Sequence, residues 1–172
     1  MEIKEVTAVG PYEIERKYLI ARPDEAWLCA QPGCRRARIT QTYLLAGDGE
    51  ERRVRRREED GACLYVETIK RPVTAVRREE IEREITREEY EALLAQADPA
   101  CRPIEKTRWM LPCAGLTLEI DVYPFWADRA ILEAEIDRED APIAFPPGLV
   151  IIREVTDDPD YKNASLARNR RV

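Results

Sequence analysis

The chain has 172 residues, and 28 Lys and Arg against 34 Asp and Glu give it a formal net charge of −6. It contains no histidine and one serine, Ser165, which excludes a histidine base, a histidine-ligated metal and a Ser-His pair. No apolar run approaches the roughly 20 residues that a membrane span needs. We therefore expect a single domain over residues 1–172, with neither a membrane nor a nucleic acid as partner.

Alternation of charged and apolar residues, the period of a strand, dominates the chain. It predicts strands over 12–20, 37–46, 50–59, 63–71, 77–85, 103–111, 116–123 and 130–137, and 149–156 fits a further short strand. Gly47-Asp48-Gly49 predicts a hairpin turn. Helices are expected over 87–96, behind an N-cap at Thr86, and over 160–168, while 23–29 fits a poorly capped helix. The pattern indicates a mainly β protein of the α+β class, built on an antiparallel sheet or barrel with peripheral helices.

The cysteines limit the redox chemistry and the metal chemistry of the chain. They are five in number and scattered, with no CxxC pair, so neither a disulfide framework nor a zinc site is expected. The first residues, MEIKEVTAVGPY, contain no apolar segment of an export signal. A cytoplasmic protein with carboxylate chemistry is expected, in which hard oxygen ligands would bind Mg²⁺, Ca²⁺ or Mn²⁺.

Like charges gather on single faces of the predicted strands, because side chains two positions apart point the same way. These faces carry Glu13, Glu15 and Lys17; Arg53 and Arg55; Thr68 and Lys70; Arg78, Glu80 and Glu82; Lys106 and Arg108; Glu119 and Asp121; and Glu133 and Glu135. Each face taken alone is typical of a solvated sheet surface. Together they also fit the interior of a closed sheet, in which buried like charges would need phosphates and divalent cations to neutralise them. The residues alone leave both interpretations open.

The order of short motifs resembles the CYTH, or triphosphate tunnel metalloenzyme, superfamily. EIERK at 13–17 matches its ExExK pattern. Further matches follow in the same order: QTYL at 41–44, Arg53-Val54-Arg55, TIK at 68–70, KTRW at 106–109, EIDVY at 119–123, LEAEI at 132–136 and REVTDDPDYKN at 153–163. The resemblance implies an eight-stranded antiparallel closed barrel, whose lumen binds a triphosphate and whose last helix belongs to a plug at one end.

The same resemblance assigns roles to the charged residues. The implied metal ligands, for Mg²⁺ or Mn²⁺, are Glu13, Glu15, Asp121, Glu133 and Glu135. The implied phosphate ligands are Lys17, Arg53, Arg55, Lys70, Arg78, Lys106 and Arg108. Further acidic lining would come from Glu80, Glu82 and Glu119. Glu13 and Glu15 are also catalytic candidates, together with Lys162 in the plug.

The expected reaction is metal-dependent hydrolysis of inorganic tripolyphosphate to pyrophosphate and phosphate, which requires mainly positioning and charge neutralisation from the protein. Three alternatives share the triphosphate group: a nucleoside or thiamine triphosphatase, an adenylyl cyclase, and a module that binds triphosphate or polyphosphate without turnover. A homodimer is expected by resemblance only.

Overall fold

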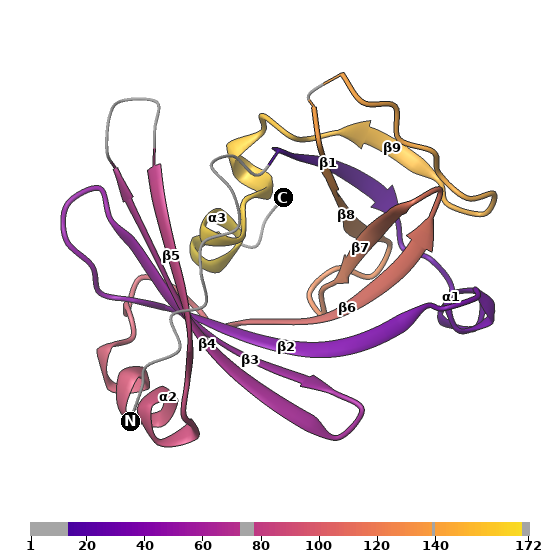
Figure 1. Ribbon diagram of the computed structural model, residues 1–172. Coiled ribbons are helices and arrows are strands. Elements are labelled where there is room, and N and C mark those ends of the chain that lie inside the picture. The colour runs from indigo at the N-terminus through magenta and orange to yellow at the C-terminus, as the bar shows by residue number, and fades with distance from the viewer. Residues whose placement is uncertain (1–13, 73–77, 139, 170–172) are drawn as a thin grey trace. The chain divides into compact units, whose positions relative to one another are not determined.

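The computed structural model describes residues 14–72, 78–138 and 140–169 (Figure 1). Its strands are β1 (Ile14–Ala21), β2 (Arg35–Leu44), β3 (Glu51–Glu59), β4 (Ala62–Pro72), β5 (Arg78–Ile85), β6 (Ile104–Cys113), β7 (Leu116–Val122), β8 (Arg129–Ile136) and β9 (Ile151–Glu154). Its helices are α1 (Glu25–Ala30), α2 (Arg87–Leu93) and α3 (Asn163–Arg168), and its 3-10 turns are η1 (Leu94–Gln96) and η2 (Pro159–Tyr161). Each predicted strand therefore has a counterpart in the structure.

The strands form one sheet in the order β5-β4-β3-β2-β6-β7-β8-β1-β9. The predicted closed barrel is wrong, because among the described strands the sheet is open and β5 and β9 are its two edges. Closure needs a hydrogen-bonding partner on both sides of every strand. The four-residue β9 pairs with β1 on one side and with no other described strand on its second side, so the sheet ends at β9. β5 is rich in Arg and Glu, a composition with which proteins protect exposed sheet edges.

The chain divides into two compact units. The first unit contains the described parts of residues 39–104 and 163–169, with β3, β4, β5, α2 and α3. The second unit contains the described parts of residues 14–38 and 105–162, with β1, α1, β7, β8, β9 and nearly all of β6. The single-domain organisation over residues 1–172 stays a prediction, as does the role of the last helix in a plug.

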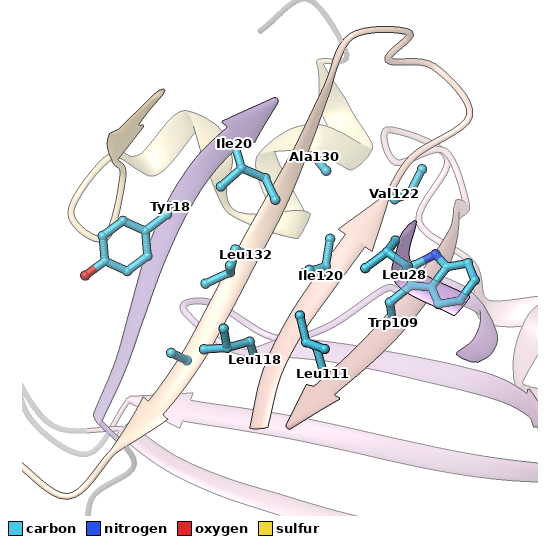
Figure 2. Packing of buried hydrophobic residues seen from close by; sticks show 11 residues of the cluster. Tyr18, Ile20, Leu28, Trp109, Leu111, Leu118, Ile120, Val122, Ala130 and Leu132 are labelled. Carbon is cyan, nitrogen blue, oxygen red and sulfur yellow. The ribbon is translucent and has the colours of Figure 1, made fainter. Parts of the chain in front are cut away.

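An apolar core covers one sheet face of the second unit (Figure 2). Tyr18 and Ile20 of β1, Leu132 of β8 and Ile120 of β7 lie on this face, and Leu28 of α1 joins them. Burial of each such side chain stabilises the unit by about 1.5–3 kcal/mol. Because strand side chains alternate, the charged residues of the same strands must lie on the opposite face.

Local capping explains where the helices begin. Asp24 caps α1 by accepting a hydrogen bond from the backbone nitrogen of Trp27 at 3.0 Å, which corrects the expectation of a poorly capped helix. Thr86 and Glu89 form a capping box at the start of α2, where Thr86 was predicted as the N-cap. The predicted C-terminal helix begins later than expected, because residues 159–161 form the turn η2 before α3 starts.

In the first unit, α2 packs on one face of the sheet, where Leu44, Val54, Ile85 and Tyr90 form a small core. Glu67 of β4 is buried on this face, 2% exposed. Its two oxygens lie 2.7 Å from Arg52 Nε and 2.7 Å from Arg83 Nε, so the carboxylate ties β3 and β5 to β4. A buried carboxylate requires such pairing, because isolated charge is costly away from water.

Candidate active site

Asp121 of β7 lies at the centre of the charged face of the second unit. Lys106 Nζ lies 2.5 Å from its Oδ2, and Arg108 Nε lies 2.7 Å from its Oδ1. A second Arg108 nitrogen, Nη2, lies 2.7 Å from Oδ2, and the strand register places Arg108 directly opposite Asp121. The guanidinium therefore binds the carboxylate through two nitrogens, the strongest common geometry for such a pair.

Glu133 of β8 extends this group to β1. Arg108 Nη2 lies 2.7 Å from its Oε2, and Lys17 Nζ lies 2.9 Å from its Oε1. Lys17 is directly opposite Glu133 in the register between β1 and β8. Lys106, Asp121, Arg108, Glu133 and Lys17 thus form one chain of ion pairs across four strands, which we call the buried ion-pair network.

Burial makes the electrostatics of the network strong. Burial alone would raise the pKa of Asp121, but Arg108 and Lys106 outweigh it and hold this pKa well below its usual value. Burial likewise opposes ionisation of Glu133, and Lys17, Lys106 and Arg108 outweigh it, so its pKa is also lowered. The pKa of Lys106 is lowered, because burial and repulsion by Arg108 together outweigh the attraction of Asp121. The network thus contains two carboxylates whose pKa values are lowered and one lysine, Lys106, whose pKa is lowered as well.

Further acids border the network. Arg108 hydrogen-bonds Glu119, and Lys17 Nζ lies 3.6 Å from Glu15 Oε1. Burial and the neighbouring Glu133 raise the pKa of Glu15, against the opposing charge of Lys17. Glu135, opposite Glu15 in the register, is exposed. Glu15 therefore lies where added positive charge would be stabilising.

The first unit carries a second set of predicted phosphate ligands on the sheet face opposite α2. Arg53 lies opposite Thr68 in the register between β3 and β4. Arg55 Nη2 lies 2.9 Å from Glu82 Oε2, and Lys70 Nζ lies 2.9 Å from Glu80 Oε2. Glu80 and Glu82 are thus counter-ions of predicted phosphate ligands, and all these side chains are at least partly exposed apart from Thr68.

Three predicted site residues are not brought into either group. Glu13 lies outside the described residues, and for Arg78 the structure describes only the backbone, at the start of β5. Lys162 follows η2 directly and is exposed. Their catalytic or binding roles stay predictions.

Sequence reasoning gave no role to Gln41, Tyr43 and Tyr123. Gln41 Nε2 lies 2.9 Å from the Tyr43 hydroxyl, and both side chains are buried. Lys106 Nζ lies 5.9 Å from the centre of the Tyr123 ring, within the range of a cation–π contact. One signal was available, because Gln41 alternates with Ile39 and Tyr43 on one face of the second predicted strand, where a buried amide needs a polar partner.

The structure also bears on metal and membrane binding. Within the ranges that it describes, no three acidic or thiol side chains are arranged as a ready metal site. The donor set nevertheless suits a hard cation, because it consists of carboxylate oxygens and includes Glu15 with its raised pKa. None of the helices among the described residues is long and apolar enough to cross a membrane.

Two curated proteins are similar to this chain over nearly its whole length. An inorganic triphosphatase of Nitrosomonas europaea is 34% identical over 159 residues, which are 90% of this chain and 96% of that protein. An inorganic triphosphatase of Acetivibrio thermocellus is 30% identical over 159 residues, covering 91% of this chain and 94% of that one.

Solved structures agree with this similarity. The crystal structure of an inorganic triphosphatase, 29% identical, matches with a TM-score of 0.58 and covers 92% of this chain and 95% of its own. A protein of Pyrococcus horikoshii OT3, 22% identical with a TM-score of 0.54, covers 75% of this chain and 81% of its own and supports the fold alone. The profile of the CYTH domain matches residues 11–168, and the chain therefore belongs to the CYTH domain family.

Proposed function

We propose that this chain hydrolyses inorganic tripolyphosphate to pyrophosphate and phosphate with the help of Mg²⁺ or Mn²⁺. The observation that carries the proposal is the buried ion-pair network, in which Lys17, Lys106 and Arg108 converge on two carboxylates. The network holds three cations and two carboxylates in fixed positions, as preorganised electrostatic stabilisation of a polyanion requires. The two inorganic triphosphatases at 34% and 30% identity support the choice of substrate.

The cations of the buried ion-pair network would bind phosphate oxygens and orient the triphosphate. Arg108 offers a planar fork that suits two oxygens, whereas Lys17 and Lys106 act as compact point charges. Further proposed ligands of phosphate oxygens are Arg53, Arg55 and Lys70 in the first unit, and Arg78. Positioning of this kind supplies most of the catalysis in phosphoryl transfer.

The acids would hold the metal and accept a proton. Glu13, Glu15, Asp121, Glu133 and Glu135 are the proposed ligands, and the bound cation would neutralise developing phosphate charge and acidify a water molecule. Glu13 and Glu15 are the candidates for the general base that accepts the proton of the attacking water. A cytoplasmic location fits the five free cysteines. A homodimer, which size-exclusion chromatography with light scattering would detect, is part of the same proposal.

The test is phosphate release from tripolyphosphate, ATP and thiamine triphosphate, each with Mg²⁺, with Mn²⁺ and without metal, with products separated by chromatography. We expect metal-dependent cleavage of tripolyphosphate in preference to the other two. Cyclic AMP without free phosphate would identify a cyclase instead. Binding of tripolyphosphate without turnover in either metal would identify a binding module.

The matched variants are Glu133→Gln in the network and Glu91→Gln on α2. Glu133→Gln should abolish metal-dependent turnover, because the amide binds neither the metal nor Lys17 as a charged partner. Glu91 is exposed on α2 and, within the described part of the chain, pairs with Arg87 alone, so it should tolerate the change. Unchanged metal-dependent turnover in Glu133→Gln would contradict the assigned site.

A further inference from the structure

Arg53 differs from the other cations of the first unit in what it contacts. Arg55 is paired with Glu82 and Lys70 with Glu80. Arg53 has no carboxylate within 4 Å among the described residues, and its buried Nε has no hydrogen-bond partner there. A half-buried guanidinium without a carboxylate is electrostatically unfavourable unless an anion joins it.

Gln41 and Tyr43 lie on β2 on the same sheet face as Arg53. Leu44 packs with Val54 in the core under α2, so Tyr43 and Arg53, the preceding residues of each strand, point to the opposite face. Gln41 is 1% exposed and Tyr43 is 5% exposed. The two side chains are joined by the hydrogen bond that Gln41 Nε2 donates to the Tyr43 oxygen at 2.9 Å.

The Tyr43 hydroxyl accepts a hydrogen bond from Gln41 and has a hydrogen left to donate. A phenol oxygen accepts at most two hydrogen bonds and donates one. Gln41 donates one to this oxygen, and the Arg53 guanidinium lies close enough that its charge opposes the effect of burial on the pKa of the hydroxyl. Among the described residues, the Tyr43 hydroxyl makes its hydrogen bond as an acceptor from Gln41, so its own hydrogen is available to a further acceptor. Burial raises the pKa of Tyr43 to about 12, so the hydroxyl keeps its hydrogen at neutral pH.

We propose that Tyr43, oriented by Gln41, donates its hydroxyl hydrogen to a phosphate oxygen of the substrate that Arg53 binds at the same time. This inference rests on the proposed function and adds a neutral donor to a site otherwise described by its charges. A hydroxyl held by Gln41 with its hydrogen available suits an anion, because an ionised phosphate oxygen only accepts hydrogen bonds.

The test compares Tyr43→Phe with Tyr90→Phe in the full chain. Both changes remove one hydroxyl from a buried ring of the first unit, but Tyr90 belongs to the core under α2. The readouts are KM and kcat for tripolyphosphate, the Kd of inorganic tripolyphosphate by calorimetry without divalent metal, and the thermal unfolding midpoint. Tyr43→Phe should raise KM and Kd about tenfold, the loss of one hydrogen bond to a charged group, and Tyr90→Phe should change neither.

A double variant tests the pairing with Arg53. In an Arg53→Lys background the effect of Tyr43→Phe should shrink to about twofold or less, because both groups act on one phosphate group. Wild-type KM and Kd in Tyr43→Phe, or full additivity in the double variant, would overturn the inference. An equal rise of Kd in Tyr90→Phe would also overturn it, because the effect would then be structural.

The same measurements separate this inference from the proposed function. If the wild-type chain binds tripolyphosphate without cleaving it and Tyr43→Phe weakens that binding, the hydrolase proposal fails and the Tyr43 assignment stands. If the wild-type chain cleaves tripolyphosphate and Tyr43→Phe does so with unchanged KM, the hydrolase proposal stands and the Tyr43 assignment fails. A wild-type chain that neither binds nor cleaves tripolyphosphate contradicts both.

Discussion

The charged sheet faces of the two units arise from the same alternation of residues but place their ion pairs in different surroundings. In the second unit, Lys17 Nζ lies 2.9 Å from Glu133 Oε1, and the two side chains are 13% and 7% exposed. In the first unit, Lys70 and Glu80 form a pair of similar length with side chains that are 30% and 36% exposed. The difference lies in solvent access and not in distance.

Solvent access decides what each pair contributes. A pair in contact with water gains little, because water screens its attraction and solvates either partner when the pair breaks. A buried pair cannot be broken cheaply, because a single remaining charge loses its only compensation. We therefore expect the network of the second unit to be structural as well as functional, and the cations of the first unit to be free to change partners.

The largest effect is expected for Asp121→Asn. The amide leaves Lys106 and Arg108 without their shared carboxylate, so the free energy of unfolding should fall by about 3–5 kcal/mol. Chemical denaturation followed by the fluorescence of the buried Trp109 and Trp126 measures this loss. Asp128→Asn, on an exposed carboxylate beside Arg129, is the control and should leave the unfolding midpoint unchanged. A loss of less than about 1 kcal/mol in Asp121→Asn would show that the network is hydrated.

An intermediate effect is expected for Glu67→Gln in the first unit. Glu67 is buried, but its partners Arg52 and Arg83 have side chains that are 23% and 44% exposed, so water can solvate them after the change. The loss should be about 2 kcal/mol in the same denaturation experiment. Glu84→Gln, on the opposite face of β5, provides the comparison. Equal losses of unfolding free energy in the two variants would mean that the ion pairs of Glu67 with Arg52 and Arg83 do not stabilise the strands.

A small effect is expected for Glu82→Gln. Its side chain is 46% exposed and pairs with Arg55, so the free energy of unfolding should change by about 0.5 kcal/mol or less. Affinity for tripolyphosphate should hold or improve, because Arg55 no longer has to leave a charged partner. Calorimetry measures the affinity, and a severalfold loss would indicate that Glu82 belongs to the binding site itself.

The smallest effect is expected for the pH dependence contributed by Glu154 of β9. Hydrogen bonds from Arg16 and Thr156 lower the pKa of Glu154 to about 2. The contribution of Glu154 to the free energy of unfolding is therefore present above about pH 4.3, the ordinary pKa of a glutamate. It is lost as the pH falls towards 2. The side chain is 40% exposed, so screening limits the contribution to about 0.5 kcal/mol. Wild type and Glu154→Gln should differ by this amount at pH 7, converge near pH 2, and converge at any pH in high salt.

The sequence predicted local structure well, because local structure depends on neighbouring residues. Alternation placed every strand, and Thr86 marked the start of α2 because its capping box lies within four residues. The expectation of a poorly capped helix near residue 23 was wrong, because the Asp24 side chain caps α1. The closed barrel was also wrong, because pairing of β1 with β9 depends on residues more than 100 positions apart.

Composition and the period of a strand are enough to establish the absence of histidine chemistry, the alternation of the strands, and the sharing of a strand face by Lys106 and Arg108. The folded arrangement was needed to show that Asp121 and Glu133 are buried between three cations, that Glu80 and Glu82 serve as counter-ions, and that Gln41 donates a hydrogen bond to the Tyr43 hydroxyl. The physical reason is that burial and long-range register set the local dielectric and the partners of a charge, and neither is encoded in the spacing of neighbouring residues.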